Sequence, residues 1–209
     1  MKLGDIALAS RAMSSAAFGP GSGVLISGLV TGGKDNVSVM AKAKAKSSYS
    51  VRAATPDDLV AIVGIYNWAV NQTFATIDSE PLSGEEAQAW WEMHGKRSKL
   101  LVATDDTGVI GWGRLLPWRQ RGYDVVESLV YVDPVHHGRG IGAALLKALT
   151  GEARGLGYLT IVASVAKDNR AGLALFTKQG FEVVGTIRNA AHKFDRWMDI
   201  TLVQKELES

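Results

Sequence analysis

The chain has 209 residues, no cysteine and a formal net charge of +2, with 46% hydrophobic and 21% charged residues. Length and composition fit a globular protein of one domain with an extra segment. The absence of cysteine excludes disulfides, a thiol nucleophile and thiolate metal ligands. The charge is too small to indicate a nucleic-acid partner, and no apolar run has the length of a membrane span.

The first 48 residues differ in composition from the rest. They are rich in Gly, Ala and Ser, and their only acids are Asp5 and Asp35. We interpret residues 1–48 as a low-complexity, disordered N-terminal extension, followed by one domain over 49–209. The alternatives are an organelle-targeting peptide and a true start at Met40. We expect a cytoplasmic protein and hold organelle targeting as the less favoured possibility.

Start and stop signals divide the domain into strands and helices. Thr55 and Pro56 are typical of a helix start, and Ser83 with Glu86 is a capping-box pattern. Residues 188–196 are expected to form a loop. The elements predicted in chain order are a strand at 49–53, helices from 55 and 83, strands at 100–103, 109–116 and 125–132, a helix from 141, a strand at 159–166, a helix from 169, and strands at 181–185 and 197–203.

The most informative stretch is the β-branched run 125–132, which is followed by a glycine-rich turn and a helical pattern from Ile141. Glycines permit unusual backbone angles and a close approach of ligand to backbone. The first amides of a helix lack intrahelical partners and carry partial positive charge. This turn therefore predicts a phosphate site, although an ordinary tight strand–helix connection has the same pattern.

The turn His137–Gly142 resembles the R/Q-x-x-G-x-G/A motif of the GNAT superfamily of N-acetyltransferases, with His137 in place of Arg or Gln. The predicted order β-α-α-β-β-β-α-β-α-β-β is also that of the family. The resemblance implies an α+β fold with a central mixed, mostly antiparallel sheet, splayed between its two central strands and flanked by helices. Further matches point to the phosphinothricin and methionine sulfoximine acetyltransferase branch: Asn71–Thr76, Ser79–Pro81, Pro117–Arg119, Tyr123, Glu127–Val132 and Lys193–Asp199.

The resemblance implies acetyl-CoA as cosubstrate, with its pyrophosphate on the glycine-rich loop and its pantetheine arm along the central strand. A fully paired interior strand is the alternative, and Asn169 is equally a plain helix N-cap. The four histidines lack metal-ligand spacing, so we expect no metal site. The expected cofactor-binding residues are Val130, Tyr131, Val132, His137, Gly138, Arg139, Gly140, Ile141, Gly142 and Asn169.

Glu127 is the candidate general base. An α-amine with a pKa of about 7.7–8 must lose a proton before it attacks. Glu127 lies in an apolar strand, where desolvation should raise its pKa and suit it to that role. The alternative is a structural glutamate neutralised by an arginine. Phe176 stands where relatives have His or Tyr, so either Tyr131 or water supplies a proton to the leaving thiolate, or that step needs no acid.

Arg119, Arg121 and Tyr123 precede the Glu127 strand. Guanidinium groups bind carboxylates with two hydrogen bonds, so this loop predicts an amino-acid-like substrate; a solvated charged loop is the alternative. The resemblance implies that Phe74 forms a wall of the substrate pocket and that Lys193 closes the pocket at a homodimer interface.

We therefore expect direct transfer of acetyl from acetyl-CoA to the α-amine of a small amino-acid analogue, of the phosphinothricin, methionine sulfoximine or methionine sulfone type. We expect no nucleic-acid or membrane partner. The alternatives are a protein or polyamine N-acetyltransferase and a non-catalytic acyl-CoA-binding module.

Overall fold

The computed structural model describes residues 48–92, 97–118 and 124–207. The chain divides into the units Met1–Lys46 and Ser47–Ser209, and the description concerns the second. The interpretation of residues 1–47 therefore lies outside the described residues, as do Arg119, Arg121 and Tyr123. The elements are β1 (Ser50–Ala53), the 3-10 helix η2 (Pro56–Asp58), α1 (Leu59–Gln72), α2 (Gly84–Glu92), β2 (Lys99–Asp105), β3 (Gly108–Pro117), β4 (Val125–Val132), η3 (Pro134–His136), α3 (Ile141–Gly155), β5 (Thr160–Ala166), α4 (Arg170–Lys178), β6 (Glu182–Lys193) and β7 (Arg196–Glu206).

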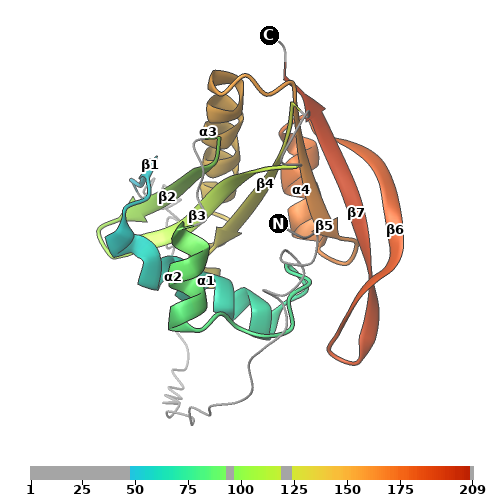
Figure 1. The fold of residues 1–209 in the computed structure, drawn as a ribbon, viewed down its shortest axis with the longest axis horizontal. Coiled ribbons are helices and arrows are strands. Elements are labelled where there is room, and N and C mark those ends of the chain that lie inside the picture. Colours follow the sequence, from blue (N-terminus) through green and yellow to red (C-terminus); the bar gives the residue numbers. More distant parts are fainter. Residues whose placement is uncertain (1–47, 93–96, 119–123, 208–209) are drawn as a thin grey trace, which may run out of the picture. The chain divides into compact units, whose positions relative to one another are not determined.

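The strands form one mixed sheet in the order β1-β2-β3-β4-β5-β7-β6 (Figure 1). The β4–β5 pair is parallel, and the other neighbouring pairs are antiparallel. The predicted α+β fold with a mostly antiparallel mixed sheet is confirmed, as is the order of the elements. In the described part of the chain no helix has the length and apolar character needed to cross a membrane.

Local side-chain contacts explain why the helices begin where the sequence predicted. The Ser83 N–H donates to Glu86 Oε2 at 2.9 Å, and the Glu86 N–H donates to Ser83 Oγ at 3.3 Å, which is a complete capping box for α2. The Oδ1 atom of Asn169 accepts the Gly172 N–H at 2.9 Å at the start of α4. These contacts satisfy amides that have no acceptor within their own helices.

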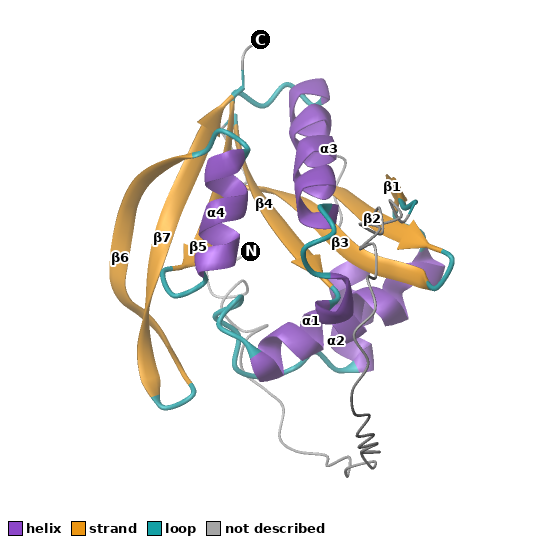
Figure 2. Cartoon of the chain, turned by 180° about the vertical axis from the view of Figure 1, so that it is seen from behind, coloured by secondary structure: helices purple, strands orange, loops and turns teal. Residues whose placement is uncertain are grey.

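The sheet is covered on both faces. Helices α1 and α2 lie in front of it in Figure 1, and α3 and α4 lie in front of the opposite face in Figure 2. The α3 side holds the larger core, in which Leu145, Leu146 and Leu149 are fully buried. On the α1 side, Ile62, Val102 and Trp112 form a second core. Each strand of the central pair β3–β4 therefore contributes alternate residues to two separate cores.

Two glycines of β3 allow α3 to lie close to the sheet. A Cβ atom on Gly113 would be 2.7 Å from Leu149 Cδ1 and 3.1 Å from the Leu129 carbonyl oxygen. A Cβ atom on Gly111 would be 3.2 Å from Ile141 Cγ2. Because Ile141 is the first residue of α3, this close approach fixes the N-terminus of the helix against the end of β4.

The β4–β5 pairing covers only part of each strand. Its register joins Val125–Glu127 to Thr160–Val162, although β4 continues to Val132 and β5 to Ala166. Beyond Glu127 the two strands separate, which leaves one backbone edge of β4 without a strand partner. This is the predicted splay, and it excludes the alternative of a fully paired interior strand.

The end of the domain differs from the prediction. Residues 188–196 were expected to form a loop, but β6 and β7 continue through this stretch as a long hairpin. Only Phe194 and Asp195 form its turn, with φ angles of +48° and +58°. The prediction was wrong because the stretch has little intrinsic strand preference, and its ladder with β7 supplies the order.

Candidate active site

A cleft of about 580 Å³ lies where β4 and β5 separate. One wall comes from the end of α1 and the loop after it, and another comes from the starts of α3 and α4. The free edge of β4 lies between them. The lining residues are Trp68, Ala69, Thr73, Phe74, Ala75, Val130, Tyr131, Val132, His136, His137, Gly138, Gly140, Ile141, Gly142, Ala143, Asp168, Asn169, Ala171, Gly172 and Leu175.

The glycine-rich loop presents main-chain amides to this cleft. Gly138 and Gly140 have φ angles of +75° and +83°, which side chains other than glycine rarely adopt. Within the described residues, no backbone or side-chain acceptor contacts the N–H groups of Gly138, Gly140, Ile141 or Gly142. The helix α3 also has no capping side chain. The loop is therefore a row of available donors at the positive end of a helix.

His137 lies at the edge of this loop. Its Nε2 atom donates to the Val132 carbonyl oxygen at 2.9 Å, and its ring stands edge-on to Trp68 with 6.4 Å between centroids. The bond joins the loop to the end of β4. A histidine here thus tethers the backbone that forms the cleft, with its other ring nitrogen available for a further contact.

Arg139 is placed differently from its neighbours, because it does not line the cleft. Its Nη2 atom lies 3.1 Å from Asp105 Oδ2, at the β2–β3 turn. The Thr107 hydroxyl and N–H are the main contacts that lower the pKa of Asp105, and Arg139 adds to the effect. Asp105 is therefore ionised, and its ion pair with Arg139 joins the glycine-rich loop to the turn between β2 and β3.

Glu127 is half-buried at the point where β4 and β5 separate. Its Oε1 atom accepts a hydrogen bond from Ser164 Oγ at 2.7 Å, across the opening between the strands. Burial raises the pKa of Glu127, and hydrogen bonds from the Ser164 hydroxyl and main-chain N–H oppose the rise. Glu127 does not itself line the 580 Å³ cleft. It lies three residues before Val130, the first residue of β4 that lines the cleft.

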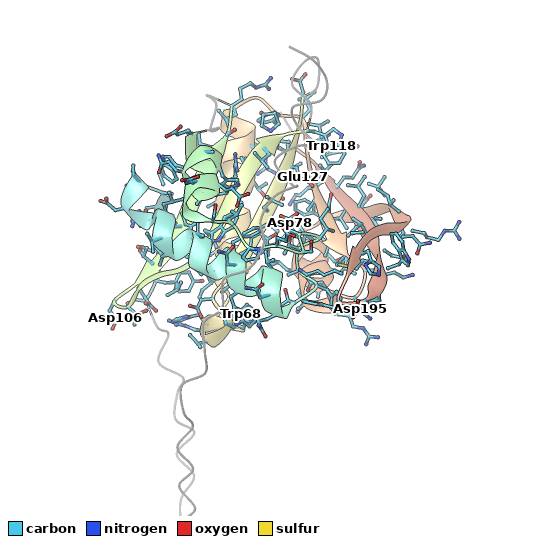
Figure 3. All side chains as sticks on the ribbon, turned by 60° about the horizontal axis from the view of Figure 1, so that its bottom comes forward. Trp68, Asp78, Asp106, Trp118, Glu127 and Asp195 are labelled. Atoms are coloured by element: carbon cyan, nitrogen blue, oxygen red, sulfur yellow. The ribbon has the colours of Figure 1, made fainter. Side chains whose placement is uncertain are left out.

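Tyr131 links Glu127 to the cleft. It lies on the same face of β4 as Glu127 and lines the cleft wall. Burial raises the pKa of its hydroxyl, and the charges of Asp78 and Glu127 raise it further. The hydroxyl therefore stays protonated at neutral pH and acts as a hydrogen-bond donor. In the view of Figure 3, Glu127 lies between Trp118 and Asp78.

The loop after α1 forms a polar network beside Tyr131. The Tyr66 hydroxyl donates to Asp78 and lies 3.3 Å from Thr76 Oγ1. Lys193 Nζ donates to the Thr76 carbonyl oxygen at 3.0 Å and is only 3% exposed. Burial lowers the pKa of Lys193. Lys193 thus holds the loop from the β6–β7 hairpin, 117 residues further along the chain.

Phe74 lines the cleft and meets the hairpin. The Arg196 guanidinium lies 3.8 Å from the centre of its ring, and Phe194 stands edge-on at 5.1 Å. Arg196 also pairs with Asp168 at 3.0 Å, beside the start of α4. The structure therefore brings together Phe74 and Lys193, which the sequence had assigned to one pocket from distant positions.

Phe176 is outside this site. It is 6% exposed and packs edge-on against Phe181, with 5.0 Å between ring centroids. Ser164 and Asp78 were not predicted from the sequence as site residues. Ser164 is one of two hydroxyl residues in β5, and only the tertiary arrangement of β4 and β5 brings it to Glu127. No group of three or more His, Asp or Glu side chains with metal-binding geometry occurs among the described residues.

Comparisons with known proteins agree with this geometry. The sequence profile of the Acetyltransferase (GNAT) family matches residues 62–181. The chain is 36% identical over 165 residues to the L-methionine sulfoximine/L-methionine sulfone acetyltransferase of Pseudomonas aeruginosa, which covers 77% of this chain and 96% of that protein. It is 35% identical over 167 residues to the phosphinothricin N-acetyltransferase of Streptomyces coelicolor, covering 75% and 95%.

A solved structure gives the same result. The phosphinothricin acetyltransferase of Sinorhizobium meliloti, a GNAT superfamily protein crystallised with acetyl-CoA, superimposes with a TM-score of 0.71 at 32% identity, covering 76% of this chain and 88% of that one. The resemblance read from the sequence motifs is thus confirmed, and the chain belongs to the GNAT family of acetyltransferases.

Proposed function

We propose that the enzyme transfers acetyl from acetyl-CoA directly to the α-amine of a small amino-acid analogue of the phosphinothricin, methionine sulfoximine or methionine sulfone type. The observation that carries the proposal is the separation of β4 from β5 immediately after Glu127. A free strand edge and a row of unpaired helix-start amides line one cleft, and the Glu127 carboxylate lies further along the same strand.

The donor side of the cleft fits acetyl-CoA. The amides of Gly138, Gly140, Ile141 and Gly142 would bind the pyrophosphate, and the edge of β4 at Val130–Val132 would bind the pantetheine arm. His137 and Asn169 also line the cleft and would contact the cosubstrate. Arg139 would hold the loop in place through Asp105. Space is limiting at Gly142, where a Cβ atom would be 3.2 Å from Leu175 Cδ2.

Glu127 would act as general base toward the substrate amine, directly or through one water molecule. Burial raises the pKa of Glu127, which makes its carboxylate a stronger base. Main-chain N–H groups on the free edge of β4 would polarise the acetyl carbonyl. Transfer is direct because the chain has no cysteine to carry an acyl group.

The substrate side is assigned from both the residues and the relatives. We propose that Arg119, Arg121 and Tyr123 contact the substrate carboxylate, that Phe74 forms one wall and that Lys193 fixes the loop above it. The named activities of the Pseudomonas and Streptomyces relatives support an amino-acid analogue. A protein or polyamine substrate would need an acidic groove, whereas the Arg196 guanidinium lies over Phe74 in the wall of this cleft.

A thiol-release assay tests the proposal. Purified protein is mixed with acetyl-CoA and a panel of amino-acid analogues, polyamines and peptides, and free CoA is measured. We expect turnover with methionine sulfone, methionine sulfoximine or phosphinothricin and little with polyamines. Preference for polyamines or peptides would contradict the substrate class. Binding of acetyl-CoA without thiol release for any amine would identify a non-catalytic binding module.

We also propose that the enzyme is a homodimer through the outer edge of the sheet. The strand β6 ends the sheet, and it exposes Val183, Val184 and Ile187 by 63%, 53% and 59%. Exposed apolar edges tend to pair with another chain. Sedimentation equilibrium should give a dimer for the parent and a monomer for Ile187→Glu. A monomeric parent at micromolar concentration contradicts this.

Part of the chain lies outside the match to the Pseudomonas protein, because 77% of this chain covers 96% of that protein. We propose that residues 1–48 are dispensable for catalysis and that the enzyme is cytoplasmic. Deletion of these residues should change the rate of thiol release by less than about twofold. It should change the free energy of unfolding by less than about 1 kcal/mol, as expected for a change away from the packed domain. A larger loss of either, or organelle import of a fluorescent fusion, would contradict the respective assignment.

A further inference from the structure

Trp68 is an exposed indole in the wall of the cleft. It lies near the end of α1 and is 38% exposed, whereas Ile65 and Ala69 of the same helix are buried. Within the described residues, Trp68 is not a member of any hydrophobic core. Packing of the fold therefore does not account for a large aromatic side chain here. Aromatic side chains in the wall of a cleft commonly contact a ligand.

The Trp68 ring is positioned by the glycine-rich loop. It stands edge-on to the His137 ring, with 6.4 Å between centroids and an interplanar angle of 82°. His137 is itself fixed by its 2.9 Å hydrogen bond to the Val132 carbonyl oxygen. The indole is thus held against a side chain that is already tethered, and part of its surface stays open to the cleft. A ligand that binds it has little ordering of the side chain to supply.

The place of Trp68 along the cleft is that of the nucleotide half of acetyl-CoA. The proposed path of the pantetheine arm follows β4 between Val130 and Val132 and reaches the pyrophosphate at the loop amides. Because His137 bonds to Val132, Trp68 stands at the loop end of this path, away from Glu127. In the view of Figure 3, Trp68 lies on the far side of Asp78 from Glu127. With the arm directed toward Val130, the adenosine extends from the opposite side of the pyrophosphate, toward Trp68.

The chemistry of the cleft favours stacking as the means of holding the base. Apart from His136 and His137, the described residues that line the cleft carry no basic side chain. Affinity for the nucleotide half therefore depends on main-chain amides and on apolar contact. Adenine and indole are flat aromatic systems, and a base stacked on an aromatic side chain contributes strongly to affinity without any charge.

We infer that Trp68 is the platform on which the adenine base of acetyl-CoA stacks, and that it makes the enzyme prefer this donor to acyl-pantetheines without a nucleotide. The inference rests on the proposed function, in which acetyl-CoA is the donor and its pyrophosphate binds the loop. Only a ribose separates the base from the pyrophosphate. A base that leaves the loop beside His137 therefore lies within reach of the indole.

The test compares ligands with and without the base, with the full-length protein. Parent, Trp68→Leu and Trp68→Phe are titrated by calorimetry with CoA and with phosphopantetheine, which keeps the arm and one phosphate but lacks adenosine. For Trp68→Leu we expect the Kd of CoA to rise about 5–150-fold, the range for removal of an aromatic ring from beneath a base, and the Kd of phosphopantetheine to change less than about twofold. Phenylalanine keeps a smaller ring and should recover part of the loss.

Trp197 offers a matched control. It is 64% exposed and also stands edge-on to a histidine, His192, at 5.2 Å, but it does not line the cleft. Trp197→Leu should leave both Kd values within about twofold of the parent. Etheno-CoA, whose modified adenine is fluorescent and is quenched by stacking, adds a spectroscopic readout. Parent and Trp197→Leu should quench it on binding, and Trp68→Leu should not.

Two results of the titrations would overturn the inference. An equal loss of affinity for CoA and phosphopantetheine in Trp68→Leu would show that Trp68 only supports the loop through His137, and unchanged affinity for both would show no role. Bound etheno-CoA that the parent leaves unquenched would also overturn it. Leucine is a good helix former at this exposed position, so the variant should fold.

The binding measurements also separate this inference from the proposed function. If the parent binds CoA but acetylates no amine, the proposed function fails, and the comparison of CoA with phosphopantetheine still decides whether Trp68 holds the base. If the parent binds no CoA at all, both fail.

Discussion

The hydrogen bond from Ser164 to Glu127 gives a quantitative test of the base assignment. The Ser164 hydroxyl donates to Glu127 Oε1 at 2.7 Å, and this bond lowers a pKa that burial raises. Replacing Ser164 with alanine removes a donor to the charged form, so the pKa of Glu127 should rise further. Because a general base works when deprotonated, the acid limb of the rate profile should move to higher pH with it.

The size of the shift follows from the strength of the bond. A hydrogen bond to a charged group contributes about 1.5–3 kcal/mol, and 1.36 kcal/mol corresponds to a change of about one pKa unit. Ser164 is exposed, so water replaces part of the lost contact, and its main-chain N–H bond to Glu127 survives. Both facts favour the lower end of this free-energy range, so the pKa of Glu127 should rise by about one in Ser164→Ala.

The assay is kcat/KM for the amine as a function of pH, with acetyl-CoA saturating. Ser164→Thr is the matched control, because it keeps the hydroxyl and threonine is well suited to a strand. We expect the threonine variant to retain the parent limb and the alanine variant to shift it. A limb that stays fixed in Ser164→Ala, or moves to lower pH, would refute either the base role of Glu127 or its coupling to Ser164.

Three further predictions concern other parts of the domain. Glu127→Gln should retain acetyl-CoA binding by calorimetry and lose about 10²–10⁴-fold in turnover, the usual contribution of a general base; a parental rate would show that another group is the base. Asp58→Asn should lower stability by about 1–2 kcal/mol at pH 7, because the Arg52 hydrogen bond, followed by contacts from Thr55, lowers the pKa of Asp58 to about 2 and Arg52 is partly exposed. Since the folded pKa is depressed, this stability is present above the unfolded pKa near 4 and is lost as pH falls toward 2, so urea midpoints of parent and variant should converge there; a constant difference would contradict the ion-pair account. Gly113→Ala should cost about 1–3 kcal/mol by urea denaturation, because its Cβ would lie 2.7 Å from Leu149 Cδ1. The control is Gly151→Ala, which meets nothing within 4 Å and lies inside α3, so it should stabilise by up to about 1 kcal/mol.

The sequence predicted those features that depend on local chemistry. Ser83 and Glu86 are a short-range signal for a helix start, and the structure contains the same pair of hydrogen bonds. The glycines at 138 and 140 are likewise explained by their own φ angles. Motif resemblance then supplied the mixed sheet, splayed between its central strands, that local signals cannot determine.

Features that depend on register could not be predicted in this way. The partnership of Ser164 with Glu127 exists because β4 and β5 pair from Val125 to Glu127 and then separate. The turn at Phe194 and Asp195 exists because β7 orders a stretch that has weak strand preference of its own.

The position of Phe176 bears on how the thiolate leaves. Phe176 is buried against Phe181 and does not reach the cleft, so the side chain at this position cannot serve as an acid. Tyr131 reaches the cleft, but its pKa is raised above the ordinary tyrosine value, far above the pKa of about 8.5 of a thiol. Full proton transfer from Tyr131 to a thiolate is therefore uphill. A hydrogen bond from its hydroxyl can still stabilise the developing charge without losing the proton, so Tyr131→Phe should lower kcat without moving the alkaline limb of the rate profile.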